Sequence, residues 1–124
     1  MSHALLIMAH GSRSEQANDE FRALVDKVAQ QLPDYSAVLP CFLELARPSL
    51  NEALQQLAHQ PVQQVQLYPL FFNRGKHVGR DIPAQIEEAR QRFPGFDIRH
   101  LDYFGNADAL ATLVSEHIRQ QMTP

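Results

Sequence analysis

Two histidines stand where apolar, strand-like runs of this chain end. His10 follows the apolar run 4–8, and His77 lies in the segment after a second run, 65–70. If both runs are parallel strands of one sheet, their carboxyl ends meet at the same edge, and the two imidazoles can converge on one metal ion. Neutral imidazole is a suitable ligand for Co²⁺, Fe²⁺ and Ni²⁺. The spacing therefore indicates a site for a divalent transition metal.

A carboxylate and a group of basic side chains join the histidines at the predicted strand ends. Glu44 follows the apolar run 37–43, so we expect it beside His10 and His77, where it can face the metal or accept protons. Guanidinium groups bind carboxylates through two parallel hydrogen bonds, so basic residues here are candidate contacts for an acidic substrate. The candidates are Arg13, Arg47, Arg74, Lys76 and Arg80.

Each of these residues also has an ordinary explanation. A loop histidine is usually a surface or helix-capping residue, and a single basic side chain is usually a solvated charge. The shared location at one sheet edge is what favours the functional interpretation. For the other histidines we keep the ordinary one: His117 as a core or interface residue of the last helix, and His3, His59 and His100 as residues without a role in the site.

Length and charge exclude several classes of protein. At 124 residues the chain fits one domain, 1–124, with a sizeable core. Its net charge of −3 provides no basic field for nucleic acid and no polybasic segment for a membrane surface. The first apolar run is too short for a signal peptide or a membrane span. The single cysteine, Cys41, lies in an apolar run and is interpreted as a buried thiol. We therefore expect a cytoplasmic protein.

Strand-like runs alternate with amphipathic, helix-like stretches along the whole chain. Strands are predicted at 4–8, 37–43, 65–70 and 97–103. The first helix has Ser12 or Ser14 as its N-cap, the second opens with a capping box at Ser49 and Glu52, and the third starts near Pro83 after a long loop, 71–80. The last helix carries an apolar face at i, i+3, i+4, i+7 and i+8, formed by Leu110, Leu113, Val114, His117 and Ile118.

Four strand–helix units in a row predict a parallel sheet with right-handed crossovers and helices on both faces. We expect a single three-layer α/β domain of flavodoxin-like kind with strand order 2-1-3-4. Pro40 suits an edge strand because proline donates no hydrogen bond to a ladder. Pro69 falls in a central strand, so it must lie at a bulge or past the last paired residue.

Three separated segments resemble the sirohydrochlorin chelatase family in its short, single-unit form. They are residues 10–13 (His-Gly-Ser-Arg), residues 42–50 around Glu44, and residues 75–83 around His77. The resemblance implies an ATP-independent chelatase, a lyase without an organic cofactor, which inserts Co²⁺ or, next, Fe²⁺ into sirohydrochlorin; archaeal relatives use Ni²⁺. It places the metal-binding histidines at His10 and His77 and the acidic residue at Glu44.

The resemblance also implies a homodimer, because longer members of the family contain two such units in tandem. The pathway, cobalamin or sirohaem biosynthesis, stays open at this point, as does the proton acceptor, which is Glu44 or a histidine not engaged with metal. The alternative function is a noncatalytic metal or tetrapyrrole carrier using the same site. A phosphate-binding or signalling module is disfavoured, because the sequence has neither a glycine-rich phosphate loop nor an acidic cluster after the first strand.

Overall fold

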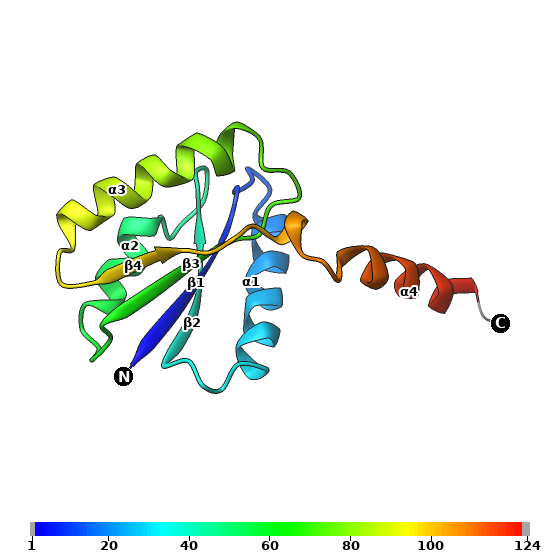
Figure 1. The fold of residues 1–124 in the computed structure, drawn as a ribbon, viewed down its shortest axis with the longest axis horizontal. Coiled ribbons are helices and arrows are strands. Elements are labelled where there is room, and N and C mark those ends of the chain that lie inside the picture. Colours follow the sequence, from blue (N-terminus) through cyan, green and yellow to red (C-terminus); the bar gives the residue numbers. More distant parts are fainter. Residues whose placement is uncertain (1, 123–124) are drawn as a thin grey trace.

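The computed structural model describes residues 2–122, and its centre is a parallel sheet with the strand order β2-β1-β3-β4 (Figure 1). The strands are β1 (His3–Ala9), β2 (Ala37–Phe42), β3 (Gln64–Pro69) and β4 (Asp97–His100). The predicted fold class and strand order are confirmed. All four carboxyl ends lie at one edge of the sheet, which is the edge expected to carry the site.

Helices cover both faces of the sheet. α1 (Glu15–Gln30) lies on one face, and α2 (Leu50–Leu57) and α3 (Ile82–Arg92) lie on the other. The Ser14 hydroxyl accepts a hydrogen bond from the backbone N–H of Ala17, so Ser14 and not Ser12 is the N-cap of α1. The predicted capping box of Ser49 and Glu52 opens α2.

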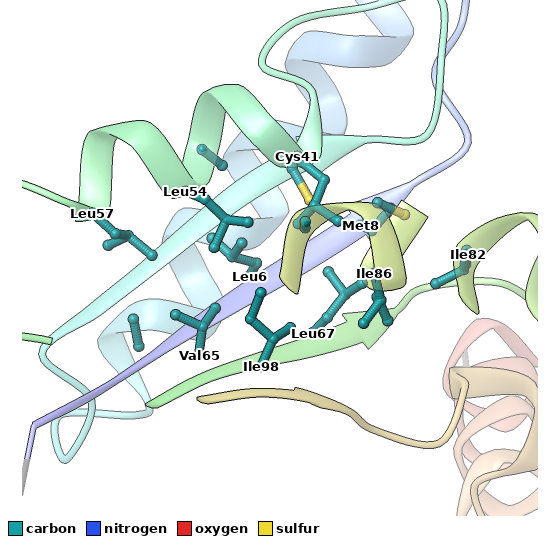
Figure 2. Packing of buried hydrophobic residues seen from close by; sticks show 14 of the residues in the cluster. Leu6, Met8, Cys41, Leu54, Leu57, Val65, Leu67, Ile82, Ile86 and Ile98 are labelled. Atoms are coloured by element: carbon teal, nitrogen blue, oxygen red, sulfur yellow. The ribbon is translucent and has the colours of Figure 1, made fainter. Parts of the chain in front are cut away.

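Strand β1 sends alternate side chains into the two halves of the core. Leu6 and Met8 pack on the side of α2 and α3 (Figure 2). Leu5 and Ile7 face α1. This alternation is the two-residue period of a strand that is covered on both faces. Cys41 is fully buried, and burial raises the pKa of its thiol, which confirms that it is an unreactive core residue.

Both prolines within strands lie where no hydrogen-bond donor is needed. Pro40 is in β2, the edge strand. Pro69 ends β3, and the next N–H, that of Leu70, donates to Met8 of β1, so the nitrogen of Pro69 faces the β4 side. The pairing of β3 with β4 already ends at Leu67 and His100, which places Pro69 past the last paired residue on that side.

Two predicted boundaries are wrong at the site-bearing end of the sheet. Strand β4 ends at His100, three residues before the predicted Tyr103. The predicted loop 71–80 is helical from residue 75, and a π-helical segment, η1 (His77–Asp81), continues directly into α3. Its side chains are therefore placed by helical geometry.

The last helix, α4 (Leu110–Met122), differs most from its prediction. Its apolar face was expected to be buried, yet within the described residues no side chain of α4 is buried. The helix projects away from the sheet instead of covering it (Figure 1). His117 is accordingly exposed in this chain and not a core residue.

Candidate active site

The loop after β1 places His10 through a close backbone contact with the loop after β2. Gly11 has a φ of +100°, and a Cβ atom there would lie 1.8 Å from the carbonyl oxygen of Glu44. The N–H of Glu44 donates to the carbonyl of His10 at 3.0 Å. Glycine is therefore required at this crossing on both conformational and steric grounds. The crossing brings a carboxylate oxygen of Glu44 to 3.8 Å from Nε2 of His10.

The buried side-chain amide of Asn18 holds the same loop through hydrogen bonds from α1. Asn18 on α1 is 3% exposed; its side-chain oxygen accepts from the N–H of Ser12 at 3.0 Å, and its amide nitrogen donates to the carbonyl of Ser12 at 2.9 Å. No sequence motif assigned a role to Asn18. The available signal was a polar side chain three residues before Phe21 and seven before Val25, on the apolar face of the helix.

A carboxylate orients His77. Asp81 lies one turn later in η1, and its Oδ2 is 2.9 Å from Nδ1 of His77. No role was predicted for Asp81 from the sequence. Its spacing from His77, i to i+4, was the signal, but it counts only if the segment is helical, and the segment was predicted as a loop.

The two imidazoles lie against each other at the edge of the sheet. Their ring centroids are 4.8 Å apart and the planes meet at 64°. Nδ1 of His10 lies 3.0 Å from the carbonyl oxygen of Gly11, which can only accept, so this nitrogen carries the proton. Asp81 selects the same tautomer in His77. The Nε2 lone pair of each neutral ring is therefore free to bind a metal ion.

Solvent reaches this pair of rings. The side chains of His10 and His77 are 41% and 43% exposed. Across residues 2–122, no group of three or more His, Cys, Asp or Glu side chains has the geometry of a preformed metal site. The structure thus brings His10, Glu44 and His77 together as an open arrangement of two imidazoles and one nearby carboxylate; the roles predicted for the three stay predictions.

The five basic candidates differ in how free their charges are. Arg47 forms an ion pair with Glu52, and Arg80 lies 3.7 Å from the carboxylate of Asp81. Arg13, Arg74 and Lys76 are exposed and take part in no ion pair among the described residues. Arg74 also lines a cavity of about 550 Å³ with Val78 and Gly79 of η1 and with residues that follow β4. Arg13, Arg74 and Lys76 are therefore the stronger candidates for binding an acidic ligand.

Fold and site together define an open parallel α/β protein that presents two imidazoles at the carboxyl edge of its sheet. The CbiX family model matches residues 4–121 of the chain. The chain belongs to the CbiX family. The resemblance stated from the three sequence segments is thereby confirmed.

Curated relatives with this sequence pattern are sirohydrochlorin chelatases of two lengths. A sirohydrochlorin ferrochelatase of Priestia megaterium is 26% identical over 117 residues, which are 94% of this chain and 44% of that protein. A chloroplastic ferrochelatase of Arabidopsis thaliana is 29% identical, with 51% of its length covered. The chain thus spans about half the length of these two relatives. By contrast, the 29% identical sirohydrochlorin cobaltochelatase of Sulfurisphaera tokodaii is covered over 92% of its length.

Solved structures show the same two lengths. A CbiX protein of Marinobacter aquaeolei VT8, described as acting in cobalamin biosynthesis, superposes with a TM-score of 0.86 at 26% identity, over 98% of this chain and 96% of that chain. SirB of Bacillus subtilis with Fe³⁺ superposes with a TM-score of 0.88 over 49% of its chain. At 23% identity, this second match shows the shared fold.

Proposed function

We propose that this chain inserts a divalent metal, Co²⁺ first and Fe²⁺ next, into sirohydrochlorin without using ATP. The observation that carries the proposal is the pair of half-exposed imidazoles, 4.8 Å apart, in a chain of the CbiX family. The preference for Co²⁺ is supported by a relative of similar length, the cobaltochelatase of Sulfurisphaera tokodaii, of whose own length 92% is covered. The ferrochelatases that match are about twice as long.

His10 and His77 hold the incoming metal ion in this proposal. Each ring offers its Nε2 lone pair because Nδ1 is already engaged by an acceptor. Two protein nitrogens leave most positions of a six-coordinate ion open, so pyrrole nitrogens can replace the remaining ligands one after another. A closed site with a full set of protein ligands would retain the ion instead.

Glu44 accepts a pyrrole proton in the proposed reaction. Metal insertion releases the protons of the pyrrole N–H groups, and a base beside the metal speeds their transfer. The carboxylate of Glu44 lies 3.8 Å from Nε2 of His10, next to the position of the incoming ion, and its side chain is 51% exposed. It can therefore reach a macrocycle above the histidines and pass the proton to solvent.

The free basic side chains orient the substrate. Sirohydrochlorin carries carboxylates around its rim, and the unpaired Arg13, Arg74 and Lys76 are available to bind them. Arg47 and Arg80 already have acidic neighbours and contribute less. Binding through exposed charges predicts a KM for sirohydrochlorin that rises with ionic strength.

We also propose that the short chain works as a homodimer, since matching ferrochelatases have about twice its length. Among the described residues, no helix is long and apolar enough to cross a membrane. A cytoplasmic location stays a prediction, as does participation in cobalamin or sirohaem biosynthesis.

Anaerobic absorbance spectroscopy tests the proposed activity. Sirohydrochlorin is mixed with Co²⁺, Fe²⁺ or Ni²⁺ in parallel, with catalytic amounts of protein and with protein-free controls. Many turnovers, fastest with Co²⁺, are expected. A spectral change that stops at one equivalent of protein would indicate the noncatalytic carrier, and a rate equal to that of the protein-free control would refute the chelatase.

A further inference from the structure

Leu45 is held in a backbone conformation that leucine disfavours. It follows Glu44 directly, its φ is 69°, and its side chain is 53% exposed. In this left-handed region the Cβ atom lies too close to the next carbonyl oxygen, so glycine or asparagine would be lower in energy. Among residues 2–122, Leu45 belongs to neither half of the core, so no buried contact offsets the strain. Strained residues of this kind are concentrated at functional sites, so Leu45 is a candidate contact for a ligand.

The rest of the loop imposes this conformation on Leu45. The N–H of Phe42 donates to the carbonyl of Pro48 at 2.9 Å and closes the loop at its base. The side-chain amide of Gln85 on α3 donates to the carbonyl of Leu43 at 3.1 Å. The close backbone crossing with the loop after β1 holds the residue before Leu45 from the other side. With its neighbours fixed in this way, Leu45 keeps a strained backbone and an exposed side chain.

Phe72 is a second exposed apolar side chain at the same edge of the sheet. Phe71 before it packs against the core, whereas Phe72 is 71% exposed. The backbone of this pair is held by Gly105, whose N–H donates to the carbonyl of Phe71 at 2.9 Å. A Cβ atom on Gly105 would lie 1.6 Å from the carbonyl oxygen of Phe72, so the two segments are in close contact. The ring of Phe72 meets that of Phe104 edge-on at 5.7 Å, and it is therefore positioned although it is not covered.

The strand order places Leu45 and Phe72 on opposite sides of the two imidazoles. Leu45 follows β2, His10 follows β1, and His77 follows β3, while Phe72 packs against Phe104 in the segment after β4. Neighbouring strands lie about 4.8 Å apart, so β2 and β4 are about 14 Å apart across this edge. A single exposed apolar residue is common on protein surfaces. Two that are fixed in place, one on each side of the imidazoles, indicate a surface for a flat apolar ligand.

We propose that Leu45 and Phe72 hold the apolar face of the tetrapyrrole over the Nε2 atoms of His10 and His77, an assignment that rests on the proposed function. The conjugated ring of a tetrapyrrole is apolar on its faces and carries its carboxylates on flexible arms at the rim. Ion pairs to these arms anchor the rim but leave the height and tilt of the ring free. Contact with the ring itself sets both, and ligand sites commonly combine apolar lining with a few polar groups in this way.

Binding of metal-free sirohydrochlorin gives the first test, with the Kd read from the absorbance of the ring. Leu45→Asn introduces a residue that tolerates the left-handed region, and Phe72→Ser removes the exposed ring. Each variant is expected to raise the Kd roughly 5- to 10-fold, because an apolar side chain covered by the ligand is lost. The increase should persist at high ionic strength, since apolar contacts are not screened, whereas that of Arg74→Ala should shrink. Met122→Ser, at a side chain 78% exposed on α4, is the matched control and should bind as wild type does.

Two further measurements separate contact with the ring from a structural role. Co²⁺ binding without sirohydrochlorin, measured by titration calorimetry, should equal that of wild type in both variants, because His10 and His77 are untouched. The urea midpoint of Leu45→Asn should lie at or above that of wild type, because the backbone strain is relieved. A lower midpoint, weaker Co²⁺ binding, or a wild-type Kd for sirohydrochlorin in both variants would overturn the inference and leave the chelatase proposal standing. Wild-type protein that binds no sirohydrochlorin would refute both.

Discussion

Two segments deliver a histidine to the same sheet edge, but they hold it in different ways. His10 sits on a loop fixed by backbone contacts: Gly11 crosses the carbonyl of Glu44, and Gly11 also accepts from the imidazole. His77 sits on the helical segment η1 and is oriented by the side chain of Asp81. The comparison shows that the first histidine depends on backbone shape and the second on a carboxylate, so different mutations should disturb them.

Disturbing the backbone contact that holds His10 should have the strongest effect on stability. Gly11→Ala forces a Cβ atom against the carbonyl of Glu44 at a φ of +100°. We expect a loss of stability of about 3 kcal/mol, from overpacking and backbone strain together. Urea denaturation measures it. Gly95→Ala, where no atom lies within 4 Å of the new methyl group, is the matched control. Equal stability of the two variants would contradict the account of this loop.

Removing the carboxylate that orients His77 should have the next largest effect. Asp81→Ala removes the acceptor that fixes the tautomer of His77, and we expect the metallation rate to fall roughly 10- to 100-fold, as for other outer partners of metal-binding histidines. Asp81→Asn keeps an acceptor oxygen and should lose less. The folded fraction is checked by circular dichroism, and Glu87→Ala on α3 serves as the control. A wild-type rate in Asp81→Ala would show that His77 needs no such partner.

A smaller effect is expected when the amide that holds the loop after His10 is removed. Asn18→Ala leaves the N–H and carbonyl of Ser12 without their partner, at a cost of about 2 kcal/mol. Gln16→Ala, exposed on the same helix, should change stability little. The readout is again the urea midpoint. If Asn18→Ala unfolds at the same urea concentration as Gln16→Ala, water replaces the amide in this loop.

The smallest effect concerns the start of α2, below the loop that carries Glu44. The Arg47 guanidinium, with help from the N–H of Ser49, lowers the pKa of Glu52 to about 2 from an ordinary 4.5. A carboxyl group with a lowered pKa in the folded protein stabilises it above pH 4.5, and this contribution is lost as the pH falls toward 2. Glu52→Gln should therefore be less stable than wild type at pH 6, with the difference shrinking through this range. A difference independent of pH would contradict the pairing.

The sequence predicted the sheet and the shared edge well because both follow from short-range patterns. Alternating apolar runs and helical stripes predicted the four strand–helix units, the expected flavodoxin-like fold gave the strand order, and the run ends placed His10, Glu44 and His77 at one edge. Asp81 was missed because its contact with His77 requires residues 77–81 to be helical. Neither a capping residue nor an apolar stripe in the sequence predicted a helix there. Asn18 was missed because its role lies in hydrogen bonds to the backbone of a loop, which can be seen only in the folded structure.

The position of α4 relative to the sheet could not be predicted from the periodicity of its sequence, for a different reason. Its apolar stripe correctly predicted a helix, but a stripe does not say whether or where the helix packs, and no side chain of α4 is buried among the described residues. The helix follows the turn at Gly105, whose contacts with Phe71 and Phe72 link segments more than 30 residues apart, and such contacts leave no periodic signal in the sequence. Patterns thus predicted the element and not its docking.

The rate of metal insertion by the double variant His10→Ala, His77→Ala decides whether the paired imidazoles carry the reaction. Wild type, this variant and His59→Ala, an exposed histidine outside the site, are compared at equal concentration with sirohydrochlorin and Co²⁺ under anaerobic conditions. The account predicts many turnovers by wild type and His59→Ala, and a protein-free rate for the double variant. Wild-type turnover by the double variant would show that metal insertion takes place without the paired imidazoles.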